Sequence, residues 1–537
     1  MVIQSPKRVA EQPDTRRVPW PWAALIGALS AALGLAVTNL VTAFGAQHPS
    51  LVSSVAARLI DNTPGSLVRF GIDRFGTNDK PALVVGIVVL SLVAGVVCGV
   101  SAAHRRWMGV VATIAVSAIG LSLALGDELA SRGRLWLAAI LGAGAAVAAL
   151  LMMLNSFEGS DTGVSYDDEP SPGNGRPMKA QDPRVKLASR RQFFVVAGGT
   201  GVLAATAVGV GRALRGSSTD ASSSVVLPAP AVLSTSTTDT LDVPGISPYI
   251  TSNDSFYRID TALFVPRTST PDSWKVKVDG MVDHPFELTY RDILAMDLVE
   301  ETITMQCVSN EVGGDLVGNA VWRGVPLKTL LDRAGVQPAG VQIVGKSQDG
   351  FTAGFPTANA LDGRVALVVI GMNGQPLPPE HGFPVRLVVA GLYGYVSGTK
   401  WLTEILLTGW DYDGYWVPRG WAKEGPIKTQ SRIDVPRNGA KLSAGKVAIA
   451  GVAWAPTRGI SKVEVRIDDG DWTPARLGDA TNHDTWVQWV VDWDATPGRH
   501  TVWARATDGT GAVQIEQQSS PDPDGATGYP VRQVTVK

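Results

Sequence analysis

The sequence predicts a multi-domain chain in three parts: an all-α bundle of transmembrane helices, then an α+β domain, then an all-β sandwich. Two observations support this prediction. The amino-terminal part contains long apolar stretches without charge, and the carboxyl-terminal part contains short alternating segments that end in Asp-Gly pairs. A chain of 537 residues also has room for about three domains.

The apolar stretches define the first part. Each is about twenty residues long, the length that spans a bilayer as a helix. The four stretches without a formal charge are 23–44, 81–103, 107–126 and 135–154. We therefore expect a membrane domain of four transmembrane helices at 1–155, a cytoplasmic linker at 156–192 and a fifth transmembrane or export helix at 193–213.

The distribution of basic residues predicts the orientation. Lysine and arginine precede the first helix, separate the second from the third, and follow the fourth, which places these loops in the cytoplasm. The loop 45–80 also carries basic residues, but it contains three aspartates as well. With five crossings, the expected location is the cell membrane, multi-pass, with the large domain on the extracytoplasmic side.

A pair of arginines precedes the fifth helix. Arg190 and Arg191 are followed by Phe193 and Phe194 and then by a mildly apolar run, which resembles a twin-arginine export signal. That pathway carries folded proteins. The alternative is the ordinary positive flank of a membrane helix, and whether the helix is cleaved is left open.

The remainder divides by composition. Residues 214–243 are rich in Ser, Thr, Ala and Pro, which is typical of a flexible linker. Segments 274–279, 364–371 and 386–390 favour strands, whereas 288–296 and 327–334 favour helical turns, so 244–433 is expected to be α+β. Residues 434–537 alternate at 462–467 and 501–506, each time before an Asp-Gly turn, and we expect an immunoglobulin-like sandwich without a disulfide. Six tryptophans are available for its core: Trp454, Trp472, Trp486, Trp489, Trp493 and Trp503.

Charge and cysteine content limit the function. The net charge of −2 and the lack of a long basic run give no support to a nucleic-acid partner. Only two cysteines are present, and Cys98 lies within an apolar run. The other, Cys307, lies in Met305-Gln306-Cys307-Val308-Ser309-Asn310 and is therefore either an inert buried thiol or a ligand.

Three segments resemble a known family when they are taken together. They are 304–327 around Cys307, 371–386 and 393–401. In this order they resemble the sulfite oxidase family of molybdopterin-dependent oxidoreductases, from about residue 249 to the carboxyl terminus. The resemblance implies a mononuclear molybdenum–molybdopterin cofactor, with Cys307 as the catalytic molybdenum ligand. A soft thiolate suits such a metal. The sandwich looks like that family's dimerisation domain, which implies a homodimer.

The same resemblance assigns cofactor-binding residues. His381, Arg386 and Lys400 are expected to hold the pterin phosphate, since they offer an N–H donor, a planar fork of donors and a point charge. Taken singly, each also fits an ordinary structural role. The weaker matches to cofactor contacts are Asn253, Tyr257, Arg258, Ser347, Gly398 and Thr399.

Departures from the family pattern bear on the substrate. Ile370 stands where sulfite oxidases place a tyrosine, and Glu311 and Val312 stand where they carry an arginine. Sulfite is a dianion that needs several cations, so these changes favour a sulfoxide reductase-like branch of the family. We expect oxygen-atom transfer on a small-molecule or peptide substrate that contains sulfur. The alternatives are a sulfite oxidase or dehydrogenase and, from another class, a cofactor-free membrane-anchored binding protein.

Histidines are scarce near the apolar helices. Only His48 and His104 lie there, at helix ends, and a haem held between helices generally needs paired axial ligands. No haem is expected, and the helices are expected to anchor the enzyme. The electron-transfer partner, a protein or a quinone, is left open.

Overall fold

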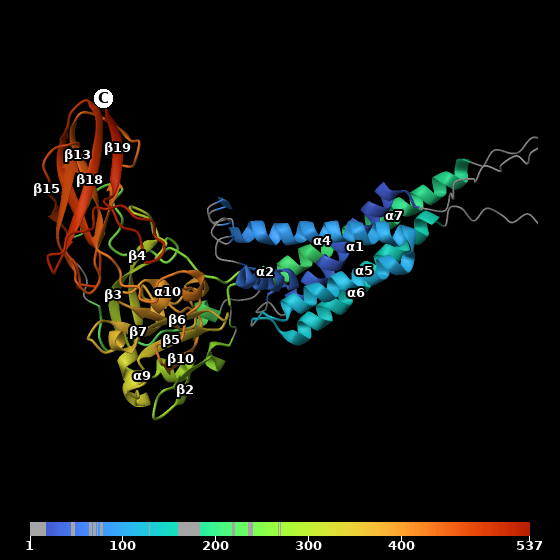
Figure 1. The fold of residues 1–537 in the computed structure, drawn as a ribbon, viewed down its shortest axis with the longest axis horizontal. Helices are drawn as coiled ribbons and strands as arrows, with labels where there is room; N and C mark the ends of the chain where they lie inside the picture. The colour runs from blue at the N-terminus through green and yellow to red at the C-terminus, as the bar shows by residue number, and fades with distance from the viewer. Residues whose placement is uncertain are drawn as a thin grey trace, which may run out of the picture. The chain divides into compact units, whose positions relative to one another are not determined.

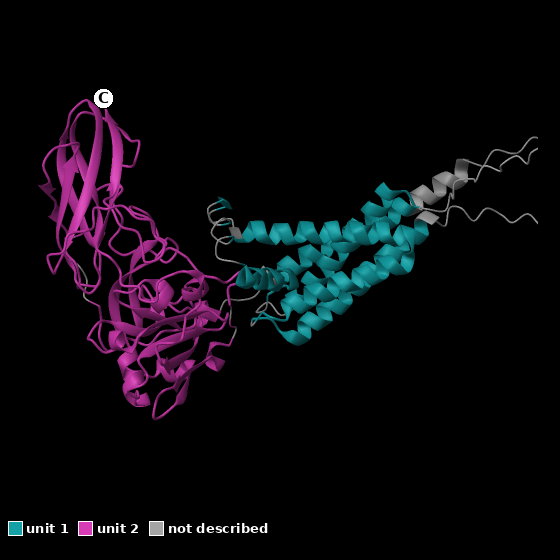
Figure 2. Ribbon diagram, viewed as in Figure 1, with its two compact units in different colours: residues 1–218 teal, residues 219–537 magenta. Residues whose placement is uncertain are grey.

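The computed structural model describes residues 18–44, 49–63, 67, 71, 74–75, 79–127, 129–158, 183–216, 221–234, 240–266, 268 and 270–537. These form two compact units, Met1–Ser218 and Thr219–Lys537 (Figure 2). His48, the basic residues before the first helix and most of the predicted cytoplasmic linker lie outside the described residues.

In the first unit, the regular secondary structure of the described residues is helical (Figure 1). Five of its helices are long and apolar enough to cross a membrane by length and composition. The short helix α2 begins at the cap residue Ser50, whose side chain accepts from the amide of Ser53. The helices of this unit are α1 Trp20–Ala43, α2 Leu51–Asn62, α4 Asp79–His104, α5 Arg106–Ala124, α6 Arg132–Glu158 and α7 Pro183–Gly216.

Glycine allows close packing between α1 and α4. A Cβ atom on Gly27 would lie 2.1 Å from the carbonyl oxygen of Gly95 and 2.9 Å from the Cα of Gly99. Both obstacles are backbone atoms, so no side-chain rotation relieves the clash. Small residues at such positions let membrane helices approach closely.

This contact yields a first prediction. Gly27→Ala should destabilise the helical unit by about 1–3 kcal/mol, because the added methyl forces α1 and α4 apart. Gly86→Ala is the matched control, because a Cβ there meets nothing within 4 Å. Alanine at Gly86 should be neutral or stabilising, since it is the better helix former. Thermal unfolding of the two variants in detergent gives the comparison, and equal midpoints would contradict the prediction.

The second unit begins with two five-stranded sheets. One has the order β2-β1-β10-β5-β6, with β1 and β10 parallel. The other has the order β3-β4-β7-β8, and β9 pairs with β7. Trp322, Tyr290, Phe355 and Phe383 fill the core of this part. Its strands and helices are β1 Lys275–Gly280, β2 Phe286–Thr289, α8 Tyr290–Leu294, β3 Val299–Gln306, β4 Val317–Pro326, α9 Leu327–Ala334, β5 Gln342–Ser347, β6 Thr352–Pro356, β7 Ala366–Met372, β8 Gln375–Pro376, β9 Arg386–Val389, α10 Gly394–Ser397 and β10 Leu402–Thr408. Short 3₁₀ turns are η2 Ala221–Ser224, η3 Pro271–Ser273, η4 Thr357–Ala360, η5 Pro379–His381 and η6 Val417–Arg419.

The carboxyl-terminal part consists of two further sheets that share one core. Their orders are β11-β13-β17-β16 and β12-β19-β18-β14-β15. Ile449 and Trp489 from the first sheet pack with Val465 and Ala504 from the second. The strands are β11 Gln430–Val435, β12 Lys441–Leu442, β13 Gly445–Trp454, β14 Ile460–Ile467, β15 Thr473–Pro474, β16 Arg476–Leu477, β17 Val487–Ala495, β18 Gly498–Asp508 and β19 Val531–Val536.

Four of the six tryptophans expected in this core lie outside its hydrophobic cluster. Trp472 packs against Tyr529, Trp503 lies beside Arg466, and the other two contact the preceding part of the chain. Trp454 and Trp486 pack in a separate cluster with Tyr249 and Val308, which belong to the preceding part of the chain. The indole N–H of Trp454 donates to the side chain of Gln306 at 2.7 Å, and that of Trp486 donates to the Tyr249 carbonyl at 2.8 Å. Both indoles thus gain an acceptor that the sandwich core lacks, since the indole N–H of Trp489, buried in that core, has no hydrogen-bond partner. The prediction that all six tryptophans fill the sandwich core was therefore wrong.

Part of the segment predicted as a flexible linker lies along β3. The amide of Ala231 donates to the Leu298 carbonyl at 2.7 Å, and the Val232 carbonyl accepts from the amide of Glu300 at 2.9 Å. Arg323 of β4 also donates to the Pro228 carbonyl. These backbone hydrogen bonds do not depend on side-chain type, so a Ser- and Pro-rich composition did not reveal them.

Candidate active site

Cys307 lies at the end of the β3–β4 hairpin. Gln306, the last residue of β3, pairs with Val317, the first of β4, so Cys307 enters the loop between them. The Cys307 amide donates to the Leu316 carbonyl at 2.9 Å, and its own carbonyl accepts from the amide of Asn310 at 3.1 Å. This backbone pairing fixes the direction of the Cα–Cβ bond of Cys307.

The Cys307 thiol is buried, with 8% of the residue exposed. Its Sγ lies 2.9 Å from Oγ of Ser309. Burial raises the pKa of the Cys307 thiol, while Ser309 and the charge of Lys400 act in the opposite direction. Such a thiol stays protonated unless a cation binds it, and a bound metal would hold it as the thiolate.

Arg386 brings a buried positive charge to the same region. It begins β9, is 3% exposed, and lies with its guanidinium carbon 4.9 Å from the ring centre of Trp322. Its Nη1 donates to the His381 carbonyl at 2.9 Å, and its Nη2 lies 3.7 Å from the sulfur of Met305. Burial lowers the pKa of Arg386 to about 10, so it remains charged at neutral pH.

The guanidinium of Arg386 is incompletely paired. Its Nε has no hydrogen-bond partner, and no ion pair joins it to a carboxylate among the residues that the structure describes. A buried cation with only neutral partners is unfavourable, which indicates that an anion belongs beside it. The side-chain nitrogen of the fully buried Asn310 is likewise without a partner.

Lys400 supplies a second buried cation. Its Nζ donates to the Glu380 carbonyl at 2.9 Å and to Oδ2 of Asp260 at 3.2 Å. Burial lowers the pKa of Lys400 to about 8, and the carboxylate of Asp260 opposes that shift. Asp260 also accepts from Nε of Arg258 at 2.9 Å, so one carboxylate joins two of the predicted site residues.

His381 is neutral in this setting. Burial, with the charges of Arg386 and Lys400, lowers the pKa of His381 to about 4. Its Nε2 lies 3.1 Å from the Asn253 carbonyl, which can only accept, so Nε2 carries the proton. The N–H expected to contact a phosphate is therefore already used by Asn253, and the free nitrogen of His381 is an acceptor.

The segment 253–258 completes the site. Tyr257 stacks on Phe256 with ring centres 5.1 Å apart. Burial and the neighbouring Cys307 raise the pKa of Tyr257 above its usual range. Asn253 accepts from the side-chain amide of Asn373 at 2.8 Å. Arg258, in contrast, is exposed at the surface.

The remaining predicted residues are held mainly by backbone contacts. Thr399 is fully buried, its carbonyl accepts from the amide of Leu387, and its hydroxyl donates to the Gly345 carbonyl at 3.5 Å. A Cβ on Gly398 would lie 3.2 Å from the methyl of Met305, so a larger residue would press on the site. Ser347 ends β5 and accepts weakly from the amide of Asp349 at 3.4 Å.

The structure thus joins most of the predicted residues. The charge of Lys400 acts on the pKa of Cys307, Cys307 acts on the pKa of Tyr257, and a hydrogen bond links Arg386 to His381. Sequence reasoning missed Asp260, Met305 and Ser309. Asp260 stands two residues after Arg258, but no local pattern shows that it pairs with Lys400.

The donor set fits an anionic metal cofactor. The site offers one soft thiol, two buried cations and unused donors on Arg386 and Asn310. A group that carries both a soft metal and a phosphate matches these three features together.

Comparison with known proteins agrees with a site for an anionic metal cofactor. Residues 262–416 match the family described as oxidoreductase molybdopterin binding domain. The chain is 33% identical over 161 residues to the uncharacterized oxidoreductase YuiH of Bacillus subtilis, a match that covers 30% of this chain and 78% of that protein. It is 31% identical over 272 residues to human mitochondrial sulfite oxidase, covering 43% of this chain and 49% of that one. The chain thus spans about half the length of the mitochondrial sulfite oxidases that it matches.

Among solved structures, the sulfane dehydrogenase SoxCD from Paracoccus pantotrophus matches with a TM-score of 0.46 at 23% identity, over 54% of this chain and 85% of that one. The chain belongs to the sulfite oxidase family of molybdopterin-dependent oxidoreductases and is an enzyme. The alternative of a cofactor-free binding protein is therefore set aside.

The pKa of Lys400 leads to a second prediction. If Lys400 holds the pterin phosphate, as the family resemblance implies, binding needs the charged lysine. The affinity of the cofactor-free protein for molybdopterin should then fall about tenfold per pH unit above about pH 8. The stability of the cofactor-free chain should change in the opposite direction. The folded pKa lies below the usual 10.5, so the unfolded chain binds more protons between about pH 8 and pH 10.5 and stability rises with pH there.

Lys400→Arg separates this effect from titration of the Cys307 thiol. A guanidinium stays charged over this range, so the variant should lose the alkaline weakening of binding. Reconstitution of cofactor-free protein with isolated molybdopterin at several pH values measures it. The prediction fails if wild type and Lys400→Arg weaken in parallel.

Proposed function

We propose that this chain is a membrane-anchored enzyme that transfers an oxygen atom at a mononuclear molybdenum centre, with a sulfur-containing substrate. When bound, the molybdenum–molybdopterin group supplies the oxo transfer and the two-electron chemistry. The observation that carries the proposal is the buried, incompletely paired guanidinium of Arg386, which acts together with the Cys307 thiol on the pKa of Tyr257. In this proposal Cys307 is the metal ligand.

The other residues have binding roles in the proposal. Arg386 and Lys400 hold the pterin phosphate, and His381 orders the loop that carries Asn253. Tyr257, Arg258, Ser347, Gly398 and Thr399 line the cofactor or shape its surroundings. Metal analysis of protein from a host that makes molybdopterin tests whether the chain binds the molybdenum cofactor. A preparation without molybdenum would refute the proposal.

For the substrate we favour a sulfoxide. Ile370 is fully buried within β7 and offers no hydroxyl, and Glu311 is exposed beside the Cys307 loop. The exposed Arg258 is paired with Asp260. These features leave little positive charge for a sulfite dianion beyond the groups assigned to the cofactor.

Sulfite is the second candidate, supported by the 31% identity to human sulfite oxidase. The two reactions run in opposite directions. Sulfoxide reduction consumes two electrons and two protons and releases the sulfide and water, whereas sulfite oxidation takes oxygen from water and releases two electrons and two protons. Turnover of peptide methionine sulfoxide with a reduced viologen dye, measured against sulfite with ferricyanide, decides between them.

We also propose a membrane location with the catalytic domain outside the cytoplasm. Five apolar helices support insertion, as does their apolar exterior, on which Leu90 is 69% and Ile119 is 63% exposed. Arg190 and Arg191, near the start of α7, support twin-arginine export. A carboxyl-terminal alkaline phosphatase fusion, active only outside the cytoplasm, tests the orientation.

The carboxyl-terminal sheets are proposed to form an immunoglobulin-like dimerisation domain. Two sheets of four and five strands around one core support this assignment. Light scattering of the purified protein tests the homodimer. Absorption spectra test the expected lack of haem. Reconstitution with candidate donors tests whether the electron partner is a protein or a quinone.

A further inference from the structure

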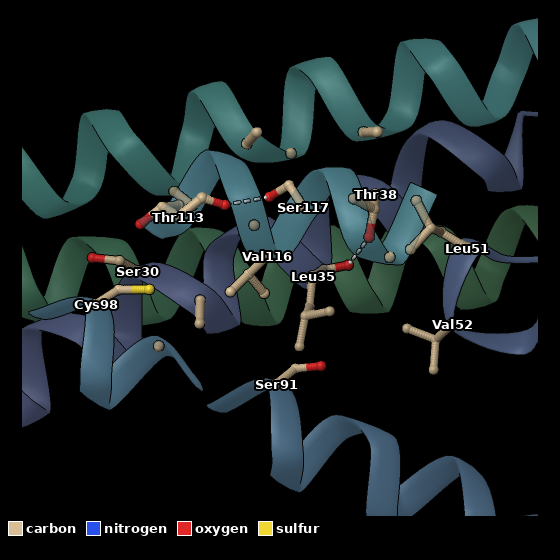
Figure 3. Close-up of a pocket in the computed structure, with 18 of the residues that line it drawn as sticks. Ser30, Leu35, Thr38, Leu51, Val52, Ser91, Cys98, Thr113, Val116 and Ser117 are labelled. Carbon is tan, nitrogen blue, oxygen red and sulfur yellow. Dashed lines mark hydrogen bonds between the residues drawn. The ribbon is translucent and has the colours of Figure 1, made fainter. Parts of the chain in front are cut away.

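The helical unit contains a cavity of about 150 Å³ between α1, α2, α4, α5 and α6 (Figure 3). It extends along α1 from Gly27 to Thr38, a distance of about 16 Å at the rise of an α-helix. At one end of the cavity, the backbones of Gly27 on α1 and Gly95 on α4 are in contact. Farther along α1, Gly34 lies against Gly142 of α6. At these glycines the helices that border the cavity are in close contact.

The lining is apolar and uncharged. Aliphatic side chains such as Leu35, Val55, Ile87 and Leu150 surround it, and none of the described residues that line it carries a charge. A ligand that carries charge would lose its hydration there without a partner. The lining thus favours an uncharged hydrocarbon ligand.

The hydroxyl groups of the lining do not change this conclusion. Ser30 donates to the Ile26 carbonyl at 2.8 Å, Ser91 donates to Ile87 at 2.8 Å, and Thr113 donates to Gly109 at 2.8 Å. Thr38 and Ser117 donate within their own helices in the same way (Figure 3). A hydroxyl has one proton, so none remains to donate to a ligand. Without free donors, the cavity offers water few hydrogen bonds. It also fits a quinone ring poorly, because the carbonyl oxygens of the ring need donors.

We propose that this cavity binds a flexible hydrocarbon chain of a membrane lipid, in a position between the helices. An engineered cavity of about the same volume with an apolar lining admits benzene, so this one has room for a segment of such a chain. The proposal rests on membrane insertion of the helical unit. The chain can come from a phospholipid, as an acyl chain, or from a polyprenyl compound.

Gly120 offers a direct test, since it lines the cavity and has space around it. A Cβ there meets only the Leu51 side chain, at 3.8 Å. Gly120→Leu therefore fills the cavity without a backbone clash. Gly144→Leu is the matched control, because Gly144 does not line the cavity and a Cβ there meets nothing within 4 Å.

The experiment measures lipid that stays with the full chain after exhaustive washing in detergent, by extraction and mass spectrometry. Wild type and Gly144→Leu should retain a hydrocarbon-chain lipid, and Gly120→Leu should lose it. A retained phospholipid identifies an acyl chain, and a retained polyprenyl compound identifies a prenyl chain. Equal retention by both variants, or no retained lipid in wild type, overturns the proposal.

Two measurements separate this result from other failures. Carbonate extraction of membranes shows whether the chain is inserted at all, and a soluble chain refutes the membrane proposal itself. Equal melting temperatures of the two leucine variants show that Gly120→Leu is folded. If Gly120→Leu is unfolded, Ala143→Leu replaces it, since Ala143 also lines the cavity, and retention of lipid by a folded Ala143→Leu overturns the proposal.

Discussion

Cys307→Ser is expected to reduce oxygen-atom transfer to background while the protein stays folded. Serine has nearly the shape of cysteine, and the backbone bonds that fix Cys307 to Leu316 and Asn310 do not involve its side chain. A hydroxyl is a hard donor with a much higher pKa than a thiol, so it is a poor ligand for a soft metal. X-ray absorption at the molybdenum edge should therefore lose one sulfur neighbour in the variant.

Ser309→Ala is the matched control for this experiment. It removes the hydroxyl 2.9 Å from the Cys307 sulfur and leaves the thiol in place. We expect it to keep the metal–sulfur bond and measurable turnover. A Cys307→Ser protein with activity equal to that of Ser309→Ala would show that the sulfur is not a ligand and would remove the basis of the proposed function.

Local patterns were sufficient to predict much of the fold. The apolar stretches predicted the long helices of the first unit, because length and lack of charge are properties of a continuous segment. The prediction of strands at 274–279 and 364–371 is confirmed by β1 and β7, and that of helical turns at 327–334 by α9. At 288–296 the chain forms the end of β2 and then α8, so only part of that segment is helical.

Contacts between distant residues could not be predicted in the same way. Asp260 and Lys400 are 140 positions apart, and Trp454 and Gln306 are 148 apart. Nothing in the local sequence around Asp260 distinguishes it from a surface aspartate. The resemblance of three segments to a family predicted Cys307, Arg386 and Lys400 as site residues, whereas the carboxylate that pairs with Lys400 required the folded structure.

The same limit applies to protonation. His381 was expected to donate to a phosphate, but burial, with the charges of Arg386 and Lys400, lowers its pKa, and the Asn253 carbonyl uses its N–H. Both causes depend on three-dimensional proximity. In the cofactor-free chain, His381 is therefore better described as a residue that holds the 253–258 segment against the site.

Arg386→Met is expected to have two effects of opposite sign. It should abolish retention of molybdopterin, because the anion loses its buried partner. It should also stabilise the cofactor-free protein, by about 1–4 kcal/mol, because a buried charge without a carboxylate partner is replaced by an apolar chain of similar length. The loss of the bond to the His381 carbonyl opposes this gain by about 1 kcal/mol.

Hydrogen exchange at the amides of β9, followed by mass spectrometry, measures this stability. Whole-chain unfolding does not isolate it, since a multi-domain protein does not unfold in one step. Arg291→Met is the control, because Arg291 is 75% exposed and its change should stay within about 0.5 kcal/mol. Molybdenum content after expression in a host that makes the cofactor gives the second readout. If Arg386→Met lowered the stability of the cofactor-free protein and kept its molybdenum, Arg386 would be a structural residue, and the phosphate would have to be held elsewhere.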